Sequence, residues 1–321
     1  MAVATVNSRT RARAPTSAGS RPRRARSRHT RSGARTAGLA SPPLAPGFSG
    51  GSIGSGSLTK SGDGTLTLGA TSTYTGKTIV QAGTLATALG ADYLSNAGVP
   101  GVFGAPTGAN ATIDLYSGVA LQNNGSNPRL NQSTDRPLNL ADSLPGTVSI
   151  RFNDNDTSLT FGAVTATGTG AKTLALFTGY NGNGDRESLI FTGGIADSSD
   201  GSPTSLEVVF QTQTASTSFV SLSGVNTFTG PITMTQGAAN PTGYLVIGGV
   251  LTQGGGFNFI STPGSGSLGN GNYPGTISLA TSNKLYYNSS ANQILSGVIS
   301  GPGDVTKAAT GQLTLSGLNT Y

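Results

Sequence analysis

Paired carboxylates are the residues of this chain with the clearest chemical potential. Asp154 and Asp156 lie two positions apart in an Asn-Asp-Asn-Asp run, and Asp185 and Glu187 flank Arg186 after a Gly-Asn-Gly run. Glycoside hydrolysis requires two carboxylates at a defined separation. Asp and Asn are also favoured in turns, where they bond their own backbone, and we prefer that interpretation. We expect no catalytic residue, and a polysaccharide-active β-helix enzyme is the alternative hypothesis.

The other reactive side chains give weaker indications. Asp197 and Asp200 precede Gly201, and the same turn interpretation applies to them. Residues 180–185 read Tyr-Asn-Gly-Asn-Gly-Asp, but one copy of a Gly/Asp pattern is a poor basis for a calcium site. Cysteine is absent and histidine occurs once, which excludes thiolate chemistry and Cys- or His-cluster metal sites. We expect neither a metal nor a cofactor.

Short β-strands must position these side chains. About half of residues 48–321 are Gly, Ser, Thr or Asn. Thr is β-branched and favours a pleated surface, whereas Gly and Asn supply turns. Apolar and polar residues alternate in short runs such as 64–69, 148–152 and 206–210. One strand pair cannot bury such an apolar row, so the pattern predicts stacked turns of a parallel coil.

The first 47 residues have a different composition. They hold ten Arg, no Lys and no acidic residue, whereas 48–321 hold nine basic and thirteen acidic residues. Few large apolar residues occur in 1–47, so we predict a disordered tail. Three explanations stay open: a polybasic arm for nucleic acid or anionic lipid, a transit-like presequence, or translation from a misassigned start. We prefer the third, and we do not expect nucleic acid as a partner.

Two long copies of an internal repeat occur in the rest of the chain. Residues 56–74 and 303–321 align without a gap and are identical at nine of nineteen positions, and each copy closes on Thr-Tyr. Lys60 and Lys307 occupy matching positions, and we expect both to be solvated surface lysines. Tandem repeats of this kind bury their apolar face against the next copy.

A third copy is half preserved. Residues 222–230 read Leu-Ser-Gly-Val-Asn-Thr-Phe-Thr-Gly, so Phe228 takes the place of the closing tyrosine. We expect the aromatic residue to pack at a corner of the coil. Residues 191–195, Phe-Thr-Gly-Gly-Ile, also echo residues 295–299, Leu-Ser-Gly-Val-Ile.

These residues resemble the autotransporter-associated β-strand repeat, also called the passenger-associated transport repeat. Residues 54–85 follow nearly the whole pattern, with Gly69-Ala70 in place of Ser-Gly and Ser72 in place of Asn, and 301–321 follow its first two thirds. The resemblance implies a right-handed parallel β-helix. It also implies a structural or adhesive, non-catalytic passenger of an autotransporter-type secreted protein, extracellular or displayed at the cell surface.

The resemblance sets further expectations about the parent protein. Such proteins carry a signal peptide in front and an outer-membrane translocator behind, and we recognise neither in this chain. The best apolar candidate for a signal, residues 37–45, is interrupted by proline, and no run is long enough for a transmembrane helix. We therefore expect 48–321 to be an all-β repeat region truncated within its last repeat. A surface glycan or a host or matrix ligand would be its partner.

Overall fold

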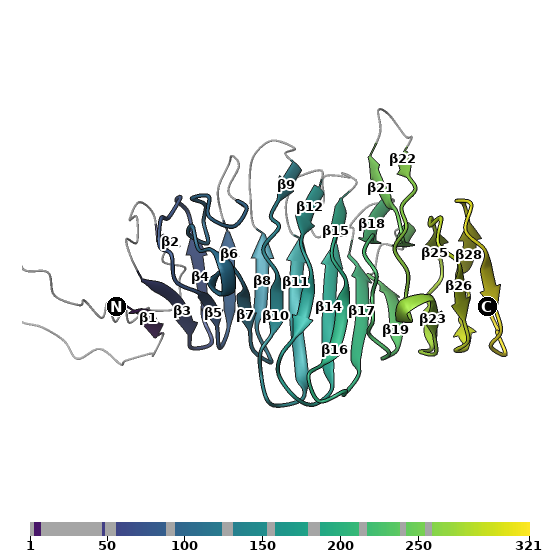
Figure 1. Cartoon of the computed structure of the whole chain (residues 1–321), viewed down its shortest axis with the longest axis horizontal. Helices are drawn as coiled ribbons and strands as arrows, with labels where there is room; N and C mark the ends of the chain where they lie inside the picture. Colours follow the sequence, from purple (N-terminus) through teal and green to yellow (C-terminus); the bar gives the residue numbers. More distant parts are fainter. Residues whose placement is uncertain are drawn as a thin grey trace, which may run out of the picture.

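The chain is a stack of short β-strands arranged along one long axis (Figure 1). The computed structural model describes residues 3–7, 47–48, 56–87, 94–123, 131–152, 158–178, 187–211, 217–237, 242–253 and 259–321. These ranges contain 29 β-strands, two 3-10 turns (Gly108–Asn110 and Gly269–Gly271) and no α-helix. The prediction of an all-β parallel β-helix is confirmed.

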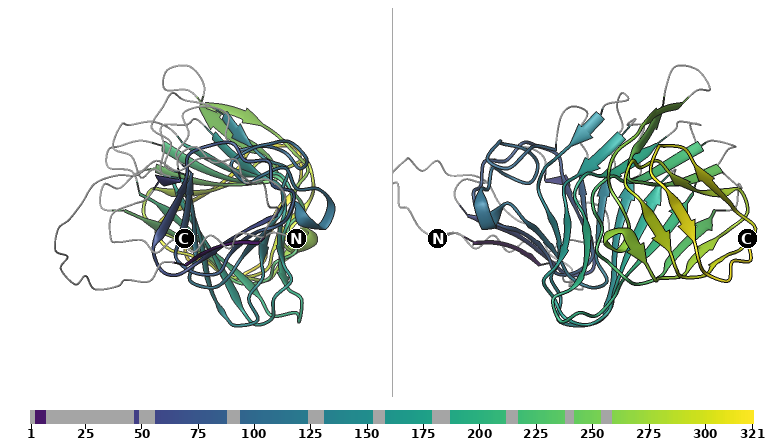
Figure 2. Two further views of the ribbon diagram at one scale, coloured as in Figure 1. Left: turned by 90° about the vertical axis from the view of Figure 1, so that its left-hand side faces the viewer. Right: turned by 45° about the vertical axis from the view of Figure 1, so that its right-hand side comes forward.

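Three walls surround the interior, which Figure 2 shows nearly end-on in its left panel. The first wall is a seven-stranded parallel sheet in the order β1 (Val3–Asn7), β3 (Ser57–Ser61), β5 (Thr78–Val80), β7 (Ile113–Leu115), β10 (Leu138–Leu140), β13 (Val164–Ala166) and β16 (Ile195–Ser198). Toward the C-terminal end a three-stranded sheet follows, formed by β23 (Asn272–Tyr273), β26 (Gln293–Leu295) and β29 (Leu313–Leu315).

The second wall runs through nearly the whole length of the stack. Its ten strands are β2 (Gly47–Phe48), β4 (Thr65–Leu68), β6 (Thr84–Thr87), β8 (Ala120–Asn123), β11 (Gly146–Phe152), β14 (Lys172–Thr178), β17 (Thr204–Phe210), β19 (Ile232–Gln236), β24 (Ile277–Leu279) and β27 (Ile299–Ser300). The third wall has seven strands, β9 (Asn131–Ser133), β12 (Ser158–Phe161), β15 (Ser188–Phe191), β18 (Thr217–Leu222), β20 (Thr242–Ile247), β25 (Asn283–Tyr287) and β28 (Asp304–Lys307).

Two strands come from the part of the sequence around the predicted tail. β1 lies parallel to β3 and β2 lies parallel to β4. The strand at Val3–Asn7 lies within the segment 1–47 that we predict to be disordered. Its Val-Ala-Thr-Val sequence has the β-branched residues that favour a strand. Residues 1–2 and 8–46 of the predicted tail lie outside the described residues, so the prediction of disorder over 1–47 stays a prediction.

In-register apolar columns fill the interior. Parallel pairing places each inward side chain on the equivalent side chain of the next coil, and these side chains are buried. One column of the second wall consists of Leu66, Leu85, Leu121, Ile150, Leu176, Val208, Met234 and Leu279. The columns explain why runs too short to form a core alone are stable in this fold.

Shortening a buried side chain within a column is expected to lower the free energy of unfolding measurably. Ile232 lies between Leu206 and Ile277 in a second column and is fully buried. Ile232→Val is expected to lower the free energy of unfolding by about 1 kcal/mol, since it removes one buried methyl group. Thr233→Ala changes the neighbouring exposed position and should leave the denaturation midpoint nearly unchanged. Equal effects at the two positions in urea denaturation would contradict the predicted alternation.

A two-stranded hairpin stands outside the walls. It consists of β21 (Val250–Gln253) and β22 (Phe259–Thr262), which pair antiparallel, and Figure 1 shows it at the upper edge of the stack. Leu251 packs in a small buried cluster with Phe219 and Val246 of the third wall. The hairpin therefore covers part of the outer face of that wall.

Candidate functional site

The repeated corner between adjacent coils is the site that the sequence marks most strongly. Asn226 is fully buried, and its Oδ1 accepts the backbone N–H of Ile195, one coil earlier, at 3.0 Å. Asn319 holds the equivalent place, where its Oδ1 accepts the N–H of Ile299 at 2.8 Å. We call this arrangement the asparagine corner. These two copies of the repeat use their asparagine to satisfy a backbone group of the coil before them, whereas the first copy has Ser72 at this position.

Backbone hydrogen bonds around the asparagine corner repeat in the same way. They run from N–H to carbonyl as Ser223 to Phe191 (3.0 Å), Ser316 to Leu295 (3.0 Å), Thr227 to Ile195 (2.8 Å) and Thr320 to Ile299 (2.9 Å). The two short echoes at 191–195 and 295–299 are thus the corners on which residues 223–227 and 316–320 stack. We infer that the two echoes resemble each other because each contacts a copy of the same repeat.

Adjacent coils approach each other so closely at the repeat corner that glycine is required there. A Cβ on Gly224 would lie 2.5 Å from the carbonyl carbon of Gly193, and one on Gly317 would lie 2.2 Å from the carbonyl oxygen of Gly297. Both distances are too short for any side chain, so adjacent coils meet here glycine against glycine. In the first copy Ala70 replaces this glycine.

The two long copies of the repeat occupy different walls. Residues 56–74 supply β3 and β4, in the first and second walls, whereas 303–321 supply β28 and β29, in the third wall and the three-stranded sheet. Burial also differs, because Tyr74 is 0% exposed and Tyr321 is 47% exposed. The predicted packing of the aromatic residue is confirmed for Tyr74 and for Phe228, which is also fully buried.

Lys60 corrects one expectation from the sequence. Its side chain is 2% exposed, and its Nζ donates to the carbonyls of Gly62 at 2.5 Å and of Ala82, in the next coil, at 2.9 Å. Burial lowers its pKa from the usual value, and the charge of Asp63 acts in the opposite direction. Lys307, at the matching position, is exposed and donates to the carbonyl of Ala309. The prediction of a solvated lysine is therefore wrong for Lys60.

Backbone carbonyls also surround the ammonium group of Lys172. Its Nζ donates to the carbonyls of Asp142 at 2.8 Å, Leu144 at 2.5 Å and Thr169 at 2.7 Å, and its side chain is buried. An ammonium group provides three donors, so three carbonyls satisfy it fully. The alternation of inward and outward residues along β14 is the sequence signal that predicts this burial. Lys172 lies two residues before the inward Leu174, and therefore faces inward.

Arg136 is the third buried cation. Its Nε donates to the carbonyl of Ala111 at 2.7 Å and its Nη1 to that of Phe103 at 2.6 Å. Its Nη2 lies 3.4 Å from Thr78 Oγ1, which also bonds Tyr74 Oη at 2.6 Å. Backbone carbonyls thus replace the carboxylate that a buried guanidinium usually finds. The cluster joins several coils and holds no reactive pair.

Alkaline titration tests the burial of Tyr74. Burial raises the pKa of Tyr74 to about 12, although the hydrogen bond from Thr78 and the charge of Arg136 lower it. In the unfolded chain tyrosine ionises near pH 10. The folded state therefore favours the protonated phenol, and this contribution to stability is present below pH 10 and is lost as the pH rises toward 12.

The measurement compares wild type with Tyr74→Phe. Between pH 9 and pH 11 wild type is expected to lose more unfolding free energy than the variant does. Absorbance at 295 nm follows the phenolates without interference, because the chain has no Trp. Equal losses in the two proteins would show that Tyr74 titrates as an exposed residue.

The structure describes only one of the four carboxylates in the acidic pairs proposed from the sequence. Asp154, Asp156 and Asp185 lie outside the described residues. Glu187 is described: its side chain is buried just before β15, and its carbonyl accepts the N–H of Phe219 at 2.8 Å. The arrangement of either pair stays a sequence hypothesis.

The carboxylate of Asp197 accepts hydrogen bonds from backbone N–H groups, as the turn interpretation predicts. Its Oδ1 accepts the N–H groups of Thr204 at 2.7 Å and Thr229 at 3.0 Å, and its Oδ2 accepts the hydroxyl of Thr229 at 2.8 Å. These bonds tie β16 to its own turn and to the following coil. A carboxylate engaged in this way stabilises the stack.

Asp200 plays the same part at another turn. It accepts the N–H of Gly170, in the preceding coil, at 2.9 Å and the N–H of Ser202 at 3.0 Å. These two bonds hold its pKa below the usual value. A carboxyl group with a lowered pKa is a poor general acid at neutral pH.

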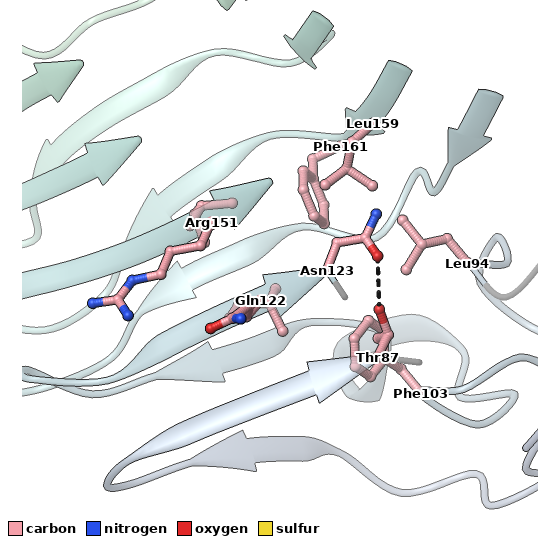
Figure 3. Close-up of a pocket in the computed structure, with 10 residues that line it drawn as sticks. Thr87, Leu94, Phe103, Gln122, Asn123, Arg151, Leu159 and Phe161 are labelled. Carbon is pink, nitrogen blue, oxygen red and sulfur yellow. Dashed lines mark hydrogen bonds between the residues drawn. The ribbon is translucent and has the colours of Figure 1, made fainter. Parts of the chain in front are cut away.

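A pocket opens among β6, β8, β11, β12 and the segment around Leu94 (Figure 3). Its lining is mostly apolar and comprises Thr87, Leu94, Phe103, Leu121, Gln122, Asn123, Ile150, Arg151, Leu159 and Phe161. Thr87 and Asn123 hydrogen-bond each other at 3.3 Å, and Arg151 points away from Phe161. This lining contains no carboxylate, so it offers no support for a two-carboxylate hydrolase.

Metal-binding clusters and membrane-spanning helices are both absent from the described residues. No three His, Cys, Asp or Glu side chains among the described residues gather into a metal-binding group. No helix within the described ranges has the length and hydropathy of a membrane span.

Comparison with known proteins identifies one segment. Residues 58–86 match the family model of the passenger-associated-transport-repeat. Neither the curated proteins nor the solved structures contain a match to the chain. The matched segment comprises β3 to β6, so one copy of the repeat spans two successive strands in each of the first and second walls.

Proposed function

Because this chain contains a passenger-associated transport repeat, we propose that it is a structural passenger segment of an autotransporter-type secreted protein. Its parallel β-helix acts as a stiff stalk outside the cell or at its surface. The parent protein supplies the signal peptide and the outer-membrane translocator. The segment is non-catalytic, and it presents surfaces for adhesion to a glycan or to a host or matrix ligand.

The asparagine corner carries the proposal. Asn226 and Asn319 each bond a backbone N–H of the coil before them, so a finished coil is the template for the next one. Repeats of this kind contact only their neighbours, and folding can propagate along the stack. A chain that emerges gradually through a membrane can fold in this way without a large core forming first.

A display experiment tests the proposal. Residues 48–321 are placed between a bacterial signal peptide and an outer-membrane translocator, with an epitope at the N-terminal end. We expect the epitope on intact cells, and we expect the β-helix to resist added protease. Asn226→Ala is expected to lower protease-resistant display several-fold, whereas the outward substitution Glu207→Ala should not.

Two results would contradict the proposed function. The first is retention of the wild-type segment inside the cell while the translocator itself is assembled. The second is display in which both wild type and Asn226→Ala are equally sensitive to protease. Either result would remove the link between stacking of the coils and export.

A further inference from the structure

The outer strand of the hairpin has a free edge. Among the described residues β22 pairs with β21 only, and all four of its residues are exposed. The N–H and C=O groups on its other side can pair with another strand. Such an edge is a template for strand addition, and soluble proteins usually block it with charge, proline or a covering element. The four residues of β22, Phe-Ile-Ser-Thr, include no charge and no proline, and Pro263 follows directly after the strand.

Apolar side chains lie on the free strand itself. Phe259 is 41% exposed and Ile260 is 56% exposed, which places both among the large apolar residues that the described surface exposes. Phe259 faces the third wall, because its ring lies 6.0 Å from that of Phe219 and 5.8 Å from that of Tyr244. Ile260 follows it and therefore faces the opposite side of the hairpin. A strand added here would find apolar contacts on both faces.

The outer face of the third wall continues this surface beyond Phe259. Tyr244 and Tyr286 are partly buried against the hairpin cluster, and their rings lie 6.1 Å apart with their planes at 72°. Lys284 and Asp304 form a half-exposed ion pair of 3.1 Å on the next strands. Aromatic rings beside a polar border are typical of interfaces that bind proteins.

The hairpin is held in position before any partner arrives. The N–H of Leu251 donates to Ser221 Oγ at 3.4 Å, and its carbonyl accepts the hydroxyl of Ser188 at 3.2 Å. Asn288 donates from Nδ2 to the carbonyl of Thr262 at 3.0 Å. Fixing β22 in advance reduces the ordering cost of binding.

We propose that the free edge of β22 binds an extended polypeptide segment as an added β-strand. The segment carries apolar side chains at alternate positions over Tyr244 and Tyr286, and β-branched side chains such as threonine between them, beside Ile260. Strand addition uses main-chain hydrogen bonds for affinity and alternate side chains for specificity. A glycan could stack on the tyrosine rings, but it cannot match the row of amide donors and acceptors along β22.

The test uses the whole chain and a labelled peptide, Lys-Val-Thr-Val-Thr-Val-Thr-Lys. Fluorescence anisotropy should show saturable binding, and methylation of alternate peptide nitrogens should weaken it at least tenfold. Ile260→Asp is expected to weaken binding at least fivefold, whereas Val99→Asp, at a comparably exposed site, should not. Amide exchange of residues 259–262 should slow when the peptide is present. Both substituted positions are exposed, so the thermal midpoint of each variant should stay within about 2 °C of wild type.

Three outcomes would overturn the inference. Equal affinity for the methylated peptide would show that backbone pairing is not used. Protection of 259–262 by chitohexaose and not by the peptide would assign the tyrosine surface to a glycan. Concentration-dependent dimers that disappear in Ile260→Asp, without peptide binding, would assign the edge to a second copy. None of these outcomes depends on export, so the inference can fail while the proposed passenger function stands.

Discussion

Asn226→Ala is expected to lower the free energy of unfolding by roughly 2–4 kcal/mol, because it leaves the N–H of Ile195 buried without its acceptor and opens a cavity. Asn226 is fully buried, and its Nδ2 also donates to Gly224 at 2.9 Å and Ser267 at 3.0 Å. Urea denaturation followed by circular dichroism measures the loss.

The last repeat copy provides the matched control for this substitution. Asn319 makes the same bond to Ile299 but is only partly buried, so Asn319→Ala should cost less than about 1 kcal/mol. A cost at Asn319 equal to that at Asn226 would mean that burial between coils contributes little. A negligible cost at both positions would contradict the asparagine corner as a stabilising element.

Lys60→Met is expected to destabilise the chain by about 2–4 kcal/mol, since the carbonyls of Gly62 and Ala82 lose a charged donor inside the protein. Methionine keeps most of the volume of the side chain, so the change removes mainly the ammonium group. The free energy of unfolding at pH 7 is the quantity to compare with wild type.

Lys307→Met provides the comparison at the same repeat position. Its ammonium is exposed and donates to the carbonyl of Ala309, two residues along the chain, so we expect a change within about 0.5 kcal/mol. If Lys60→Met were as mild as Lys307→Met, the cage of carbonyls would carry no net stabilisation. Comparing the unfolding free energies of the two variants therefore separates the contribution of contacts with the next coil from that of the lysine itself.

Much of this architecture could be predicted from the sequence. Alternating runs, such as Leu206 to Phe210, predicted which side chains face inward, and the repeat copies predicted a stack of parallel coils. The echo of 191–195 in 295–299 is also visible in the sequence. These features are local or repeat along the chain, so one sequence reveals them.

Other features depend on contacts that a single sequence does not reveal. Lys60 and Arg136 lie at inward positions, but the carbonyls that satisfy them come from turns and neighbouring coils. The two long copies of the repeat lie on different walls, although their sequences align without a gap. The hairpin β21–β22 interrupts the parallel pattern, and its docking depends on Phe219, far away in the sequence.

Disulfide mapping tests the central claim, that successive coils stack in parallel register, most directly. The chain has no cysteine, so a pair introduced at Glu207 and Thr233, which are register partners in β17 and β19, reports on one contact. Parallel neighbours lie about 4.8 Å apart, within the reach of a disulfide. We predict rapid disulfide formation for Glu207→Cys with Thr233→Cys, and little for Glu207→Cys with Thr235→Cys. Equal crosslinking of the two pairs, or none in either, would contradict the stacked β-helix.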